Sequence, residues 1–267
     1  GTFTHNGGTV LFDGTNTFGG SAYGHINPAT NTFNNLTINA SGKFIQLREN
    51  GTTLTVAGDL TLTNGTLANY GTQTPVLTVT GNATIANGAT IGGTDTSSAM
   101  NFGSLEIQSG GTYIATSGTT TITSENSSNQ SFWNDGTFTH NNGKVVIDTA
   151  GNNHTTVKAT TFYDLEVNQT SSTYEAKFRP KTGTHSEILN NFTLTSGIYE
   201  MHADGDTLDI YGLTTIEADG QFLKDAEHTG LVTHHGLVTN RGNYMLKDGV
   251  TVKMNGGFRQ LGTFTTP

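Results

Sequence analysis

The sequence predicts an all-β chain folded as a right-handed parallel β-helix, or β-solenoid, of about 12 coils. Three observations predict this fold. Apolar and polar residues alternate strictly in short runs, one four-residue phrase recurs along the chain, and turn-forming residues separate the runs. Alternation with a period of two, rich in Thr, Val and Ile, is typical of strands, and no window has the apolar spacing of a helix.

The recurring phrase is a polar residue, an apolar residue, Thr or Glu, and a second apolar residue. Its copies lie at 35–38, 59–62, 82–85, 104–107, 164–167 and 191–194, with a longer form at 212–216. Within each half of the chain, neighbouring copies are about 21–27 residues apart, which is the length of one solenoid coil. Phe33, Phe102 and Phe162 each precede the first apolar residue of a phrase by three positions. We therefore assign these rings to packing.

Between the runs lie pairs that accept a positive φ in tight turns, such as Asn64-Gly65, Asn87-Gly88 and Ser196-Gly197. An antiparallel array of hairpins would show the same alternation and the same turns. We expect parallel strands, because a phrase that recurs once per coil stacks like side chains on like. A meander would reverse the chain direction at every turn.

A longer repeat contains the short one. Residues 1–13 and 136–148 are identical at nine of thirteen aligned positions, and the phrase Gly-Thr-Phe-Thr returns at 262–265. We expect one continuous solenoid made of two long repeats, 1–133 and 134–267, as a slice of a larger array. Because His5 and His140 recur at equivalent places beside Asn, we expect both to cap or stack on a turn rather than to catalyse.

Composition and charge narrow the classes of function. Charged residues make up only 12% of the chain, the net charge is −9, and there is no cysteine. Two of the 12 basic and six of the 21 acidic residues lie in 1–133, so the second repeat has the more charged surface. No basic stripe suited to phosphates is present, so nucleic acid is not expected as a partner. We expect Lys177, Arg179 and Lys181 to lie in a loop that bulges from a coil.

No apolar run approaches the ~20 residues that span a bilayer, so no membrane insertion is expected in this segment. Signal or attachment segments are expected in flanking sequence.

Several phrases resemble the repeats of large extracellular β-helical proteins. They are Gly-Thr-Phe-Thr-His-Asn-x-Gly followed by Val-x-x-Asp, Phe-x-x-Leu-x-Ile/Val-Asn at 33–39 and 162–168, and Leu-Thr-Val-x-Gly-x-Leu-Thr-Leu at 54–62. The style is similar to that of filamentous-haemagglutinin-like bacterial surface adhesins and of tailed-phage fibre or appendage proteins. The resemblance implies a β-helix outside the cell or on a virion, and it carries no catalytic residues across. The chain departs from the style at 172–187 and 223–261.

Two groups of residues are candidates for a metal site. Asp204, Asp206 and Asp209 surround a glycine turn, and oxygen-rich loops of this kind hold Ca²⁺, although the known calcium motifs are not matched. An acidic turn at a coil corner is the alternative. His228, His234 and His235 are a weaker zinc hypothesis, because adjacent residues in a strand point to opposite faces. No other cofactor is expected.

An enzyme is the main alternative class, because parallel β-helices also carry polysaccharide lyases and hydrolases. Glycoside hydrolysis needs two carboxylates on one face, and we considered Asp164 with Glu166 and Glu187 with Glu200. Asp164 and Glu166 occupy polar slots of the recurring phrase, however, which makes surface decoration the simpler interpretation.

We expect a non-enzymatic structural or adhesive solenoid. The candidates for glycan contact are Trp133, Tyr163, Tyr199, Tyr211 and Tyr244, and filling coil corners is the alternative role of these rings. The expected partners are a surface glycan or host-cell receptor, further copies of the repeat, or other fibre subunits.

Overall fold

The computed structural model describes residues 3–14, 23–27, 32–92, 97–150, 155–158, 160–169, 175–179, 185–201, 203–223 and 228–266. Its regular secondary structure in these ranges consists of strands. No helix long and apolar enough to cross a membrane occurs in them. The chain forms two compact units, which we call unit 1 (Gly1–Ile122 and Trp133–Gly143) and unit 2 (Thr123–Phe132 and Lys144–Pro267).

Unit 1 is a parallel β-solenoid. Its strands are β1 (Thr9–Phe12), β2 (Tyr23–Ile26), β3 (Thr32–Phe33), β4 (Asn35–Leu47), β5 (Thr53–Val56), β6 (Leu60–Asn69), β7 (Val76–Ile85), β8 (Ala89–Ile91), β9 (Met100–Ile107), β10 (Thr112–Ile114), β11 (Thr119–Ile122) and β13 (Thr137–Thr139). β12 (Gln130–Asn134) spans the sequence boundary between the units.

Three parallel stacks make the faces of unit 1. One runs β1–β4–β6–β7–β9, a second β2–β4–β6–β8–β10–β13, and a third β3–β5–β7–β9–β11. In the first stack Leu36 lies beside Leu60, Leu60 beside Ala83, and Ala83 beside Leu105. The phrase therefore stacks like on like, as predicted. These pairings are parallel, so the hairpin array is excluded for this unit.

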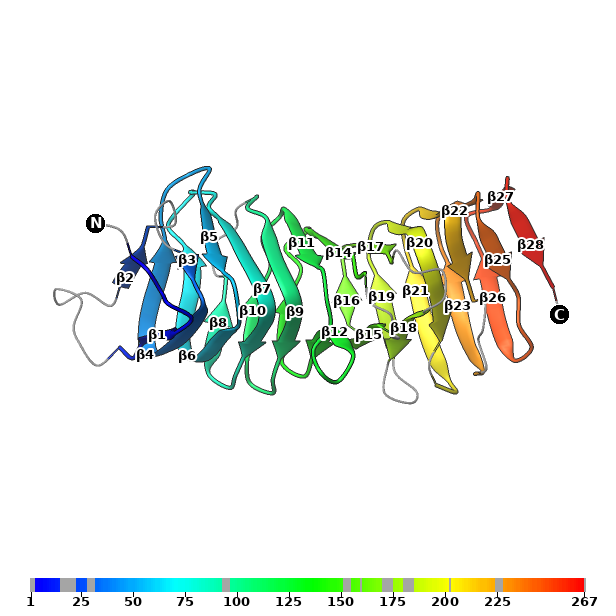
Figure 1. The fold of residues 1–267 in the computed structure, drawn as a ribbon. Helices are drawn as coiled ribbons and strands as arrows, with labels where there is room; N and C mark the ends of the chain where they lie inside the picture. Colours follow the sequence, from blue (N-terminus) through cyan, green and yellow to red (C-terminus); the bar gives the residue numbers. More distant parts are fainter. Residues whose placement is uncertain are drawn as a thin grey trace. The chain divides into compact units, whose positions relative to one another are not determined.

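Unit 2 repeats this architecture. Its strands are β14 (Lys144–Ile147), β15 (Thr155–Lys158), β16 (Thr161–Phe162), β17 (Asp164–Asn168), β18 (Glu175–Arg179), β19 (His185–Ile188), β20 (Phe192–Met201), β21 (Asp206–Ile210), β22 (Thr214–Phe222), β23 (Gly230–His234), β24 (Val238–Asn240), β25 (Asn243–Met245), β26 (Val250–Met254), β27 (Phe258–Gln260) and β28 (Thr263–Thr265). In Figure 1, β20 and β22 lie side by side; β22 pairs in parallel with β20 and, on its other side, with β24.

The basic segment of unit 2 differs from the expectation. β18 places Lys177 and Arg179 in a strand that pairs with β15 and β20, not in a bulging loop. Lys181 lies outside the described residues. Over its described residues the chain makes about 9 turns, somewhat fewer than the 12 coils expected.

The core of each unit is a thin stack of inward-facing side chains. Leu36, Leu60 and Leu105 in unit 1 are essentially inaccessible to solvent, as are Phe192 and Leu194 in unit 2. Each buried side chain of this size contributes about 1.5–3 kcal/mol by leaving water. The three rings assigned to packing are also buried, as predicted (Phe33, Phe102 and Phe162).

The polar residue that opens each phrase joins successive coils. Asn35 Oδ1 accepts a hydrogen bond from the Asp59 N–H (2.9 Å), and Asp59 Oδ1 accepts one from the Asn82 N–H (2.8 Å). In unit 2, Asp164 Oδ1 and Asn191 Oδ1 accept the N–H groups of the residues one coil further on. We call these contacts the corner ladder. It satisfies backbone donors at a corner where the strand pairing is interrupted.

The histidines of the long repeat form equivalent turns. His5 Nδ1 accepts from the Gly7 N–H, and His140 Nδ1 accepts from the Asn142 N–H, both at 3.0 Å. The residue after each histidine, Asn6 or Asn141, has a positive φ of 48° or 44°. These histidines cap a turn, as their recurrence predicted.

Candidate ligand-contacting surface of unit 2

Two of the five aromatic candidates are in the core. Tyr199 is 3% exposed, Tyr244 is 0% exposed, and the ring of Phe222 packs between them at centroid distances of 4.7 and 4.8 Å. Burial raises the pKa of both phenols. The expectation that these two rings contact a glycan is therefore wrong. They occupy an inward position that stacks on Phe222.

Trp133 lies at the surface of unit 1 and is half-buried. Its Nε1–H donates to Asp135 Oδ2 at 2.7 Å, so the polar edge of the indole is held by a neighbour in the chain. Part of the ring remains accessible, and the suggested contact role of Trp133 stays a prediction.

Tyr163 and Tyr211 belong to one column of side chains on unit 2. The register of β16, β19, β21 and β23 aligns Phe162, Ile188, Ile210 and His234. The residues that follow them, Tyr163, Leu189, Tyr211 and His235, are thus stacked one per coil, and we call them the exposed column. Tyr163, at one end of this column, is half-buried, and its suggested contact role stays a prediction. Leu189 is 39% and Tyr211 45% exposed. The Tyr211 ring stacks on the His235 imidazole with centroids 4.5 Å apart and planes 5° from parallel. This contact fixes the orientation of the Tyr211 ring.

A row of carboxylates and a histidine borders the exposed column. β19 and β21 pair so that Glu187 lies beside Asp209. His185 Nε2 is 3.4 Å from Glu187 Oε1, His185 Nδ1 is 3.7 Å from Asp209 Oδ2, and His235 Nε2 is 3.0 Å from Asp209 Oδ1. Partial desolvation and then the two nearby carboxylates raise the pKa of Tyr211, which keeps its phenol protonated. The surface combines a flat ring with several hydrogen-bond acceptors.

The carboxylate pairs considered for catalysis are not brought together as such. Asp164 belongs to the corner ladder, and Glu166 pairs with Lys144 and accepts a hydrogen bond from Thr195 Oγ1 (2.7 Å). Glu200 is 3% exposed on β20, which is in a different sheet from β19 and its Glu187. The neighbour of Glu187 is Asp209. An alignment of 185–188 with 207–210, which the structure places in register, could have found this pair from the sequence.

The three aspartates considered for Ca²⁺ have separate environments. Asp204 Oδ1 accepts from the Thr229 N–H and Oγ1–H at 2.8 and 3.1 Å, and these contacts lower its pKa. Asp206 is buried, and its Oδ2 accepts from the Ala203 N–H at 2.8 Å. Asp209 lies on the open sheet beside His235. Among the described residues no three His, Cys, Asp or Glu side chains are placed to hold a metal, so the aspartate hypothesis is not supported.

The zinc hypothesis is not supported, because adjacent residues in a strand point to opposite faces. His234 is fully buried and His235 is exposed, so the two rings face opposite ways. His228 lies against Asp204 with its Nδ1 3.7 Å from Oδ1.

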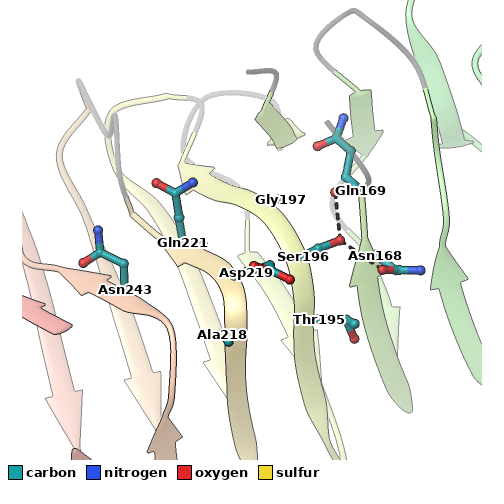
Figure 2. A pocket seen from close by; sticks show the side chains of 10 residues that line it. Asn168, Gln169, Thr195, Ser196, Gly197, Ala218, Asp219, Gln221 and Asn243 are labelled. Atoms are coloured by element: carbon teal, nitrogen blue, oxygen red, sulfur yellow. Dashed lines mark hydrogen bonds between the residues drawn. The ribbon is translucent and has the colours of Figure 1, made fainter. Parts of the chain in front are cut away.

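Sequence reasoning missed a polar groove on unit 2, which Figure 2 shows from close by. The groove has a volume of about 650 Å³ and is lined mainly by amide and hydroxyl side chains of β17, β20, β22 and β25.

Comparison with known proteins does not assign the chain to a family. No family model matches the chain, and neither does a curated protein or a solved structure.

Proposed function

We propose that the chain is a non-enzymatic structural and adhesive segment of a cell-surface or virion protein. Its coils space and display a surface that contacts a glycan or a host-cell receptor. The observation that carries this proposal is the exposed column, where the Tyr211 ring lies near the carboxylates of Glu187 and Asp209. Aromatic faces pack on the apolar faces of sugars, and carboxylates accept hydrogen bonds from sugar hydroxyls.

The framework suits display because its inward and outward positions have separate tasks. Inward residues stack like on like, and the corner ladder joins the backbone of successive coils. Outward side chains can therefore vary in chemistry without disturbing the core. In a repeat architecture this arrangement produces extended binding surfaces. The likeness of the phrases to those of adhesins and phage fibres supports the same assignment, with an extracellular location.

A glycan array tests the proposal. The intact chain and Tyr211→Ala are applied to immobilised bacterial and host glycans, with Tyr70→Ala as the matched control. Tyr70 is also an exposed tyrosine, 40% accessible, but it lies in unit 1. We expect Tyr211→Ala to reduce binding about two- to tenfold, because aromatic stacking contributes about 0.5–1.5 kcal/mol beyond the area that it buries, and Tyr70→Ala to leave binding unchanged. Equal binding by all three proteins would remove the exposed column from the interaction.

The alternative is a polysaccharide-cleaving enzyme, and the register of Glu187 with Asp209 is what favours it. Neighbouring strands are about 4.8 Å apart, which is near the carboxylate separation of retaining glycosidases. A reducing-end assay on neutral and acidic polysaccharides tests this alternative. Turnover that is lost in both Glu187→Gln and Asp209→Asn would replace the adhesive proposal with catalysis.

A further inference from the structure

The groove in Figure 2 owes its shape to a column of glycines. Gly197 lies beside Gly220 in the pairing of β20 with β22, and Gly242 packs on Gly220 in the next coil. A Cβ on Gly220 would be 2.6 Å from the Leu194 carbonyl oxygen, and a Cβ on Gly197 would be 2.8 Å from Gln169 Cβ. No side chain fits at Gly197 or Gly220, so these two lining residues present bare backbone to the groove.

Polar side chains form the two walls. Asn168, Ser196 and Asp219 are aligned on one side by strand register, with an irregularity in the pairing just before Asn168 and again before Ser196. Gln221 and Asn243 are aligned on the other side. Figure 2 shows the side chains of both walls around the same opening. The volume of about 650 Å³ is within the range of about 300–1,000 Å³ that small-molecule sites occupy.

The first wall is partly held in place by its own hydrogen bonds. Ser196 Oγ–H is within 3.0 Å of Asn168 Oδ1 and 2.8 Å of the Gln169 carbonyl oxygen, and Asn168 Nδ2 donates to Asp148 Oδ1. The backbones of Asp219 and Gln221 pair within the sheet, but their side chains make no hydrogen bond to another described residue. They are therefore the groups with hydrogen-bonding capacity to offer a ligand from opposite walls.

The chemistry of the lining selects a class of ligand. Amides and hydroxyls both donate and accept hydrogen bonds, and the one carboxylate accepts only. No basic side chain lines the groove, so an anion would meet Asp219 without a counter-charge. A divalent cation such as Ca²⁺ takes six or more oxygen ligands, usually with several carboxylates among them. The groove has a single carboxylate, so its lining does not suit such a cation. An uncharged, hydroxyl-rich molecule fits the lining best.

We propose that this groove binds an uncharged sugar residue, with Asp219 and Gln221 hydrogen-bonding its hydroxyls from opposite walls. The inference rests on the proposed glycan-contacting function and deepens it by assigning a second contact and a ligand class. The exposed column supplies stacking, while the groove supplies hydrogen-bond recognition.

The test is an NMR titration of the intact, ¹⁵N-labelled chain with neutral trisaccharides (maltotriose, mannotriose and chitotriose) and with anionic trigalacturonate. We expect a neutral trisaccharide to shift the side-chain amide signals of Gln221 and Asn243. Ala218→Trp, which fills the groove from an exposed position, should abolish these shifts. Asp219→Asn should weaken binding about tenfold, and Asp248→Asn, an exposed carboxylate outside the groove, is the control.

The possible outcomes separate the two proposals. Shifts at Gln221 that persist in Ala218→Trp, or trigalacturonate binding as tightly as the neutral sugars, would overturn the groove assignment. Binding that depends on Tyr211 but leaves the Gln221 and Asn243 amides unmoved would also overturn it, while the proposed function stands. If no sugar shifts a signal either at Tyr211 or in the groove, both the groove assignment and the proposed function are overturned. Far-UV circular dichroism of each variant checks that the solenoid is intact.

Discussion

Lowering the pH is expected to destabilise unit 2 through one buried side chain, His234. The imidazole is 0% exposed. Its Nδ1 is 2.8 Å from Thr214 Oγ1 and its Nε2 is 3.0 Å from the Tyr244 hydroxyl. Each hydroxyl can donate or accept, so the neutral ring has both nitrogens satisfied, and a protonated ring would also find two acceptors. The cost of protonation is therefore desolvation of the charge, not loss of hydrogen bonds.

The magnitude follows from the pKa. Burial, with a smaller contribution from His235, lowers the pKa of His234 from 6.5 to about 4. Because the folded pKa lies below the unfolded pKa, the unfolded chain binds more protons between these values, and stability falls as the pH drops through this window. The full loss is about 3 kcal/mol, and about 2 kcal/mol of it has occurred when the pH has fallen from about 7.5 to about 5.

Urea unfolding followed by circular dichroism at several pH values measures this loss. His234→Gln stays neutral throughout and should lose about 2 kcal/mol less than the parent chain between the same two pH values. His235→Gln, at the exposed neighbouring position, should keep most of the parental pH dependence, because burial is the main cause of the lowered pKa of His234 and His235 the smaller one. An NMR titration of the His234 ring gives an independent reading. A ring that titrates near 6.5, or an unchanged pH dependence in His234→Gln, would refute the reasoning.

Three further predictions concern the framework. Asp59→Ala removes the ladder acceptor for the Asn82 N–H and should lower stability by about 1 kcal/mol in urea unfolding, whereas Asp59→Asn keeps the acceptor and should cost less. Gly81→Ala places a Cβ 2.7 Å from a backbone carbonyl oxygen and should cost about 1–3 kcal/mol more than Gly8→Ala, whose Cβ would be 3.3 Å from its nearest atom; equal melting temperatures would contradict the close packing of coils. Tyr113→Phe removes a buried hydroxyl that is 2.7 Å from a threonine hydroxyl, so calorimetry should show a loss of about 1–2 kcal/mol, and a neutral result would mean that the partner is satisfied elsewhere.

The fold could be predicted because each coil repeats its own sequence. Phrase spacing gave the parallel register that places Leu36, Leu60, Ala83 and Leu105 together. The polar residues that precede these four apolar residues are aligned as well. The corner ladder therefore forms at the first position of the phrase. Recurrence of His5 as His140 likewise predicted a shared turn.

The errors at the candidate site arose where outward and inward positions were judged residue by residue. Tyr199 pairs in register with Phe222, Phe222 with Tyr244, and Tyr244 with Phe264. Reading these aromatic residues as one column at the coil spacing would have assigned Tyr199 and Tyr244 to the core. Strict alternation also fails locally, because Tyr199 and its neighbour Glu200 are both buried.

The groove could not have been predicted in this way. Its walls depend on an irregularity in the register of β17, β20 and β22, which shifts Ser196 opposite Asn168 and Asp219. Spacing between phrases does not reveal which residue of a coil is the extra one. The two glycines that line the groove, Gly197 and Gly220, are visible in the sequence, but their meaning depends on the side chains that the register places on either side.

Comparison of the outward rows within each unit shows where charged side chains are concentrated. In unit 1, the outward row on β5, β7, β9 and β11 contains the uncharged residues Thr55, Thr78, Asn101 and Thr121. The outward row on β16, β19, β21, β23 and β26 of unit 2 contains Thr161, Glu187, Asp209, Thr233 and Lys253. The strand pairing in both rows is parallel, and it does not require charge at these positions. Strand pairing therefore does not account for the charged groups next to an exposed tyrosine. Under the proposed function these groups would contact a polar ligand, and unit 2 is where binding experiments should begin.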